Sequence, residues 1–189
     1  MLWIVVMLSL VGHCAALLPT FGICPEVETI ERLNMTTFMG KWYEAERYFS
    51  IVEFGAKCGT FNYSAGQNGA LRIVTSQTSA LTGIESNLEA IARPISRADD
   101  PKLTVSYPSL PIQYPTPHWV LGTDYDSYAV LWSCTNMGVF SIKSAWILTR
   151  ERQPPVPVVE KAYKILDKNH ISRAFFYRTD QKNCPAKRN

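Results

Sequence analysis

The chain has 189 residues, of which 47% are hydrophobic and 19% are charged, and its formal net charge is +3. This length and composition fit one globular domain with a substantial core and argue against a second domain. The basic residues are scattered along the chain except for Lys187 and Arg188. That distribution is typical of a solvated surface and gives no indication of a nucleic-acid partner.

The chain opens with an apolar run over residues 2–11, followed by small residues that suit cleavage by a signal peptidase. We interpret residues 1–16 as a secretory signal and residues 17–189 as one domain. No Lys or Arg precedes the run, so a signal anchor is the alternative. However, Gly12 and Pro19 interrupt the run well short of the ~20 apolar residues that a membrane span needs. We therefore expect a secreted, extracellular protein.

Removal of the signal takes Cys14 away and leaves Cys24, Cys58, Cys134 and Cys184. An even number of cysteines in a secreted chain indicates disulfides, and four cysteines allow three pairings among which the sequence alone cannot choose. A metal site is the alternative, but the chain has no C-x-x-C pair and no nearby group of histidines. We expect no metal, no cofactor and no free thiol.

Two sequons, Asn34-Met-Thr36 and Asn62-Tyr-Ser64, are potential glycosylation sites in a secreted chain.

From Gly40 onward the chain consists of short strand-like segments separated by turn signals, a pattern typical of an all-β barrel or sandwich. The expected strands are Gly40 to Arg47, Cys58 to Tyr63, Leu71 to Thr78, Ile84 to Ala92, Leu103 to Tyr107, His118 to Thr123, Tyr128 to Thr135 and Phe140 to Arg150. Eight strands in up-and-down order predict a closed antiparallel barrel with room for one small ligand.

The connections between these strands carry their own signals. Asn68-Gly69 is a strong hairpin signal, and Asn136 to Gly138 predicts another hairpin. Prolines 108, 111, 115 and 117 predict a loop, because proline cannot donate to a sheet ladder. One helix is expected, over Val156 to Lys168, with an apolar stripe that must lie against the barrel wall. A last short strand is expected over Ala174 to Arg178.

Three short motifs occur in a fixed order along the chain: Gly40-Lys-Trp42, Thr123-Asp-Tyr125, and Arg150 near the end of the last long strand. Together with Cys24-Pro25, Asn62-Tyr-Ser64, Ser133-Cys134, Ala145-Trp-Ile-Leu148 and Asn183-Cys-Pro185, they resemble the lipocalin family. Within the family they are most similar to the apolipoprotein D group and its insect Lazarillo-type relatives. These motifs span nearly the whole mature chain.

The resemblance implies an eight-stranded up-and-down barrel with one C-terminal helix packed on its wall. It also implies the disulfides Cys24–Cys134 and Cys58–Cys184, and it favours Asn62 over Asn34 as the glycosylated residue. It places Trp42 beneath the Arg150 side chain at the closed end of the barrel.

The alternation of the fifth strand places Leu103, Val105 and Tyr107 on one face, which we expect to point into the barrel. The resemblance adds further pocket-wall positions, namely Tyr63, Ile73, Thr75, His118, Val120 and Trp146. Such a wall suits an apolar molecule, so the sequence predicts a secreted carrier of one fatty acid, retinoid or sterol-like ligand. A dry core without a cavity is the simpler alternative for each of these residues.

Two other functions are compatible with the same barrel. Bilin-binding insect lipocalins share the scaffold, so a tetrapyrrole is possible. The loops Ile51 to Ala56 and Tyr107 to Pro117 are unusually apolar, which is typical of a membrane or receptor contact. Enzymatic activity is not expected, because the sequence lacks a nucleophile elbow, a P-loop and a dinucleotide fingerprint. A thiol-dependent isomerase would need an unpaired cysteine.

Overall fold

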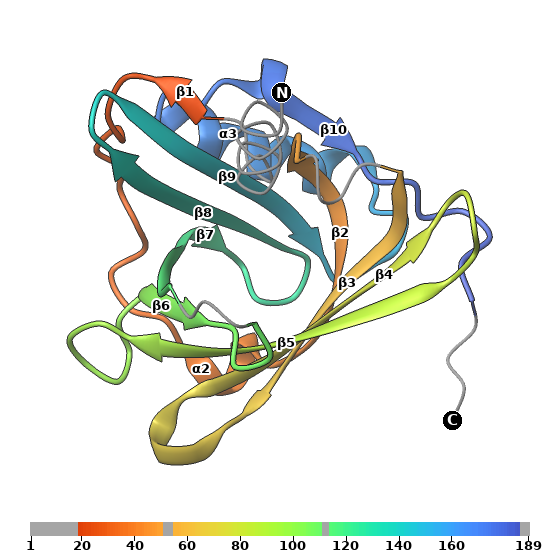
Figure 1. The fold of residues 1–189 in the computed structure, drawn as a ribbon, viewed down its shortest axis with the longest axis horizontal. Coiled ribbons are helices and arrows are strands. Elements are labelled where there is room, and N and C mark those ends of the chain that lie inside the picture. The colour runs from red at the N-terminus through yellow and green to blue at the C-terminus, as the bar shows by residue number, and fades with distance from the viewer. Residues whose placement is uncertain (1–18, 51–54, 111–113, 186–189) are drawn as a thin grey trace, which may run out of the picture.

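A closed antiparallel barrel forms the body of the protein, as the sequence predicts (Figure 1). The computed structural model describes residues 19–50, 55–110 and 114–185. Each strand from β2 to β9 pairs with the next one in sequence, and the pairing of β9 with β2 closes the barrel. These strands are β2 (Gly40–Tyr48), β3 (Ala56–Ala65), β4 (Leu71–Ser79), β5 (Glu85–Pro94), β6 (Lys102–Ser106), β7 (Thr116–Thr123), β8 (Tyr128–Met137) and β9 (Phe140–Thr149).

Short elements at both ends of the chain extend this sheet. β1 (Pro19–Phe21) pairs with β9, and β10 (Phe176–Arg178) pairs with β2. Neither β1 nor the single-turn helix α2 (Met35–Phe38) is predicted from the sequence. The expected strand from Ala174 is shorter than predicted, because η3 (Arg173–Phe175) forms a 3-10 turn that the Ser172 side chain caps.

The proline-rich stretch also differs from the prediction. The sequence predicts Pro117 in a loop, yet it lies in β7 opposite Thr104 of β6. β7 pairs with β8 only from Trp119 onward, so the other edge of β7 is unpaired at Pro117. Proline is tolerated at such a position because an unpaired edge needs no donor. Smaller differences concern Ile84, which precedes β5, and Arg150, which follows β9.

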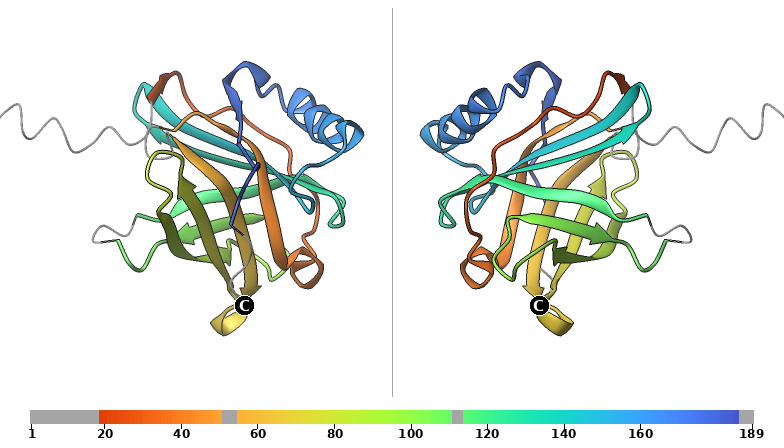
Figure 2. Two further views of the ribbon diagram at one scale, coloured as in Figure 1. Left: turned by 90° about the vertical axis from the view of Figure 1, so that its right-hand side faces the viewer. Right: turned by 90° about the vertical axis from the view of Figure 1, so that its left-hand side faces the viewer.

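Helix α3 (Val156–Lys168) has the predicted bounds and lies against the outside of the barrel (Figure 2). Ala162 and Leu166 are fully buried, and they pack with residues of β7 and β8. Gly122 makes this close approach possible, because a Cβ there would stand 2.8 Å from the Ile165 side chain. None of the helices in the described ranges is long and apolar enough to cross a membrane.

Trp42 and Arg150 join the elements at the closed end of the barrel. The Arg150 guanidinium lies 3.7 Å from the centre of the fully buried Trp42 ring. The indole N–H donates to the Phe38 carbonyl at 2.9 Å, so this buried donor is satisfied. Arg150 in turn donates to the carbonyls of Lys41 at 3.0 Å and Tyr125 at 2.9 Å. One side chain therefore connects α2, β2, β9 and the β7–β8 turn.

The first prediction concerns this stacked pair. We expect Trp42→Ala to lower the free energy of unfolding by about 3 to 5 kcal/mol, because it leaves a cavity in a fully buried position and removes the stacking surface. Urea denaturation measures this loss. Trp119→Ala, on the outer face of β7, is the matched control and should cost clearly less. Equal losses in the two variants would contradict the role of Trp42.

Candidate ligand-binding site

A cavity of about 790 Å³ occupies the part of the barrel next to the β4–β5 and β8–β9 hairpins. Its apolar wall is formed by Tyr48, Leu88, Tyr107, Tyr114, Ile142 and Trp146. Trp146 is half-buried, and it packs from above on the core cluster that contains Trp42. The barrel interior therefore consists of a packed region at the closed end and a hollow region above it.

The nine predicted pocket-wall residues divide between these two regions. Thr75, Tyr107 and Trp146 line the cavity. The other six belong to the packed core below it, and all are at most 6% exposed: Tyr63, Ile73, Leu103, Val105, His118 and Val120. His118, the polar member of this group, packs between Tyr63 and Trp146. Alternation along the strands identifies the inward face correctly, but it does not give the depth at which the packed core ends.

Tyr63 and His118 form a polar pair in the packed core just below the cavity. The Tyr63 hydroxyl and His118 Nε2 are hydrogen-bonded at 2.9 Å, and the His118 ring lies 5.8 Å from the Trp146 ring. Burial lowers the pKa of His118 from 6.5 to about 4, and burial, followed by the neighbouring Tyr107, raises the pKa of Tyr63. Both groups are therefore uncharged at neutral pH, and each is a hydrogen-bond partner of the other below Trp146.

The sequence reasoning missed the polar residues of the cavity wall. Gln77 and Ser86 face each other across β4 and β5, and Ser133 and Ser144 face each other across β8 and β9. All four line the cavity. Strand alternation alone could have identified two of them. Gln77 lies two residues after Thr75, and Ser144 lies two residues before Trp146, so each shares the face of a predicted pocket residue.

A buried ion pair lies in the wall beside the cavity. Arg47 is the register partner of Trp146, and Glu44 is the partner of the core residue Leu148, so both face inward. Arg47 donates to Glu44 Oε1 at 2.7 Å and to Thr179 Oγ1 at 3.1 Å. The positive charge is thus compensated within the protein.

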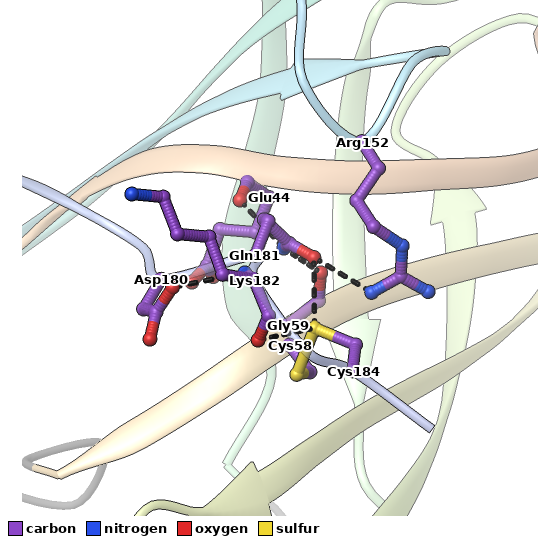
Figure 3. Close-up of a disulfide and its surroundings, with 8 residues drawn as sticks. All are labelled: Glu44, Cys58, Gly59, Arg152, Asp180, Gln181, Lys182 and Cys184. Carbon is purple, nitrogen blue, oxygen red and sulfur yellow. Dashed lines mark hydrogen bonds between the residues drawn. A yellow bond between two sulfur atoms is a disulfide. The ribbon is translucent and has the colours of Figure 1, made fainter. Parts of the chain in front are cut away.

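The C-terminal segment holds this part of the wall together. The ladder between β2 and β3 ends at Tyr43 and Thr60. Beyond it, the Gln181 amide donates to the carbonyls of Glu44 at 2.9 Å and Gly59 at 2.8 Å (Figure 3). Gln181 therefore bridges the two strands where their own hydrogen bonds stop.

Two disulfides tie the ends of the chain to the barrel. Cys58 is bonded to Cys184 beside the Gln181 bridge, and Cys24 is bonded to Cys134 of β8. These are the pairs that the resemblance implies. Within the described part of the chain, no three His, Cys, Asp or Glu side chains form a group that could hold a metal ion.

Both sequons lie on the surface. Asn34 caps α2, since its Oδ1 accepts from the Thr37 N–H at 3.1 Å. Asn62 is exposed on the outer face of β3, in a groove of about 440 Å³ that also contains Lys41 and Arg152. Glycosylation of either residue remains a prediction.

The other signature residues form the β7–β8 turn. The Asp124 carboxylate accepts from the backbone N–H groups of Ser127 at 2.8 Å and Tyr128 at 3.0 Å. The Thr123 hydroxyl donates to the Tyr128 carbonyl at 2.7 Å and accepts from the Tyr125 N–H at 2.9 Å. The turn therefore presents the Tyr125 carbonyl to Arg150 in a fixed position.

The second prediction concerns the pH dependence of stability. The His118 imidazole takes up a proton near pH 6.5 in the unfolded chain, but only at about pH 4 in the folded protein. The unfolded state therefore binds more protons between these values, and the free energy of unfolding falls as the pH decreases through this window. Above pH 6.5 His118 is neutral in both states, so its protonation no longer reduces the free energy of unfolding. Relative to His118→Gln, the unmodified protein should lose up to about 3 kcal/mol by pH 4.

Urea denaturation of both proteins between pH 4 and pH 7 measures this difference. The glutamine side chain of the variant can still reach the Tyr63 hydroxyl, so the comparison isolates the titration of the imidazole. Parallel stability curves for the two proteins would contradict a buried, neutral His118.

Comparisons with known proteins agree with this geometry. Residues 39–183 match the model of the lipocalin / cytosolic fatty-acid binding protein family. Apolipoprotein D of Macaca fascicularis is 33% identical over 169 residues, which cover 87% of this chain and 85% of that protein. The Lazarillo protein of Schistocerca americana is 30% identical over 162 residues, which cover 84% of this chain and 74% of that protein.

Solved structures show the same fold. Lobster apocrustacyanin A1 superposes with a TM-score of 0.75 at 21% identity, over 88% of this chain and 93% of that one. The signature residues, the closed barrel and the family match all lead to the same assignment: this chain belongs to the lipocalin family.

Proposed function

We propose that this protein is a secreted carrier that holds one small hydrophobic molecule, such as a fatty acid, a retinoid or a sterol-like compound, inside its barrel. The observation that supports the proposal best is the cavity of about 790 Å³ above the packed core. Ligand pockets in proteins commonly enclose about 300 to 1,000 Å³. The name of one relative, apolipoprotein D, points to lipid for that protein.

The size of the apolar wall gives an order of magnitude for affinity. Burial of ~300 Å² of apolar ligand surface contributes about 7 kcal/mol before the cost of association. A few polar contacts with the wall offset that cost, which permits dissociation constants of roughly micromolar size. Secretion fits the two disulfides, because such bonds persist in oxidising compartments. The proposed signal over residues 1–16 lies outside the described residues.

The third prediction tests this function on the full chain expressed in a eukaryotic cell and collected from the medium. Native mass spectrometry should show a mature chain that begins near Leu17 and binds retinol or a sterol at about 1:1, because the barrel has one interior. Trp146→Ala should weaken binding at least several-fold, since Trp146 forms the cavity floor.

Trp119→Ala, which removes the same side chain from the outer face, should leave binding unchanged. The panel should include biliverdin, the alternative ligand. If no retinoid, sterol, fatty acid or biliverdin changes the native mass, the carrier function is wrong.

A membrane contact at the open end is a second candidate function. Leu81 and Ile84, near the β4–β5 turn, are 93% and 67% exposed, and Val139 of the β8–β9 turn is 63% exposed. These turns border the cavity, so a ligand could pass between the barrel and a lipid layer without crossing water. Leu110 and Tyr114 add to this rim, whereas residues 51–54 and 111–113 lie outside the described residues.

The fourth prediction is that the protein co-sediments with phosphatidylcholine vesicles and that Leu81→Asp combined with Val139→Asp reduces the bound fraction several-fold. Insertion of a charge into the lipid interface is unfavourable, which is the reason for the expected loss. Val156→Asp, a 72% exposed position on α3, is the control. Equal binding by all three proteins would exclude contact through the open end.

A further inference from the structure

Four polar side chains of the cavity form two pairs on opposite walls. The Gln77 and Ser86 pair belongs to β4 and β5, and the Ser133 and Ser144 pair belongs to β8 and β9. In the order of strands around the barrel, two strands separate these pairs in either direction. None of these four side chains has a hydrogen-bond partner within the described part of the chain, so each can serve a ligand. Tyr48, Tyr107 and Tyr114 of the apolar wall lie on or next to the intervening strands, whereas Leu88, Ile142 and Trp146 flank the polar pairs on β5 and β9.

Ser50 adds a further polar residue to the wall. It is 7% exposed and lines the cavity, and its hydroxyl oxygen has no hydrogen-bond partner among the described residues. That oxygen has almost no accessible surface, so it adds to the polarity of the wall without being exposed to a ligand.

The described lining is rich in hydroxyl and amide groups, and it contains no Lys, Arg, His, Asp or Glu. Arg47 is the inward-facing cation beside Trp146, and its guanidinium is already bonded to Glu44 at 2.7 Å. His118 is neutral, hydrogen-bonded to Tyr63 and lies below the floor. The cations near this interior are therefore compensated or neutral before a ligand arrives.

A carboxylate loses its hydration when it enters such a cavity, and no opposite charge in the described lining offsets that loss. A hydroxyl, ketone or ester loses far less, and it can be satisfied by serine and amide side chains. We propose, on the basis of the carrier function above, that the cavity selects uncharged ligands with oxygen groups and discriminates against the carboxylates and sulfates of the same skeletons. Biliverdin, with its two propionates, and ionised fatty acids fall in the disfavoured class, which narrows the carrier function proposed above to uncharged retinoids and sterol-like compounds.

The test uses pairs of ligands that differ in charge but little in shape. Retinol and methyl retinoate should bind with similar affinity near neutral pH, whereas retinoic acid should bind at least about tenfold more weakly. Cholesterol and cholesterol sulfate form a second pair with the same expected order. Equal affinity within both pairs would overturn the inference while leaving the carrier function intact. Failure of every ligand to bind would overturn both.

A designed cation provides the reciprocal test. Ser144→Lys adds a positive charge to the cavity wall, and it should raise the affinity for retinoic acid relative to retinol at least about tenfold. Ser76→Lys adds the same charge to the outer face of β4 and should leave the ratio unchanged. Because both ligands are measured on one sample, partial unfolding cancels in the ratio. An unchanged ratio in Ser144→Lys, with retinol still bound, would contradict the inference.

Discussion

The stacking of Arg150 on Trp42 is the interaction on which the rest of the structure depends. The guanidinium lies 3.7 Å from the ring centre and donates to backbone carbonyls of β2, of the α2 segment and of the β7–β8 turn. Gly40, with φ of +95°, allows the chain to enter β2 close to this side chain, since a Cβ there would stand 3.3 Å from Arg150. The Arg150 cation and the Trp42 ring therefore fix the closed end of the barrel, and the hydrophobic core packs against them.

This arrangement explains why the barrel is filled at one end and hollow at the other. Phe38 is in aromatic contact with both Trp42 and Tyr63, and together with the aliphatic residues of β4 to β8 these rings fill the closed end. Above Trp146 several inward positions are serine, threonine or glutamine, which are too small or too polar to fill the interior. The ligand cavity is thus a consequence of the change to small and polar side chains along β4, β5, β8 and β9.

The sequence predicts the barrel, its strands and the limits of α3, because alternation and turn residues are local signals. The alternation of side chains does not indicate how deep in the barrel a residue lies. Leu103 and Val105 therefore share the inward face with Tyr107, as predicted, but they belong to the packed core and not to the cavity wall. The Glu44–Arg47 pair was also missed. A bulge between Glu44 and Glu46 changes the alternation, so that Glu46 points outward to Tyr163 and Arg47 points inward.

A crystal structure of the protein with retinol bound tests the division between packed core and cavity most directly. We expect the ligand to lie above Trp146, between the Gln77–Ser86 and Ser133–Ser144 pairs, and the hydrogen bond between Tyr63 and His118 to stay at 2.9 Å. A ligand inserted between Tyr63 and His118, with that bond broken and Trp146 displaced, would contradict it.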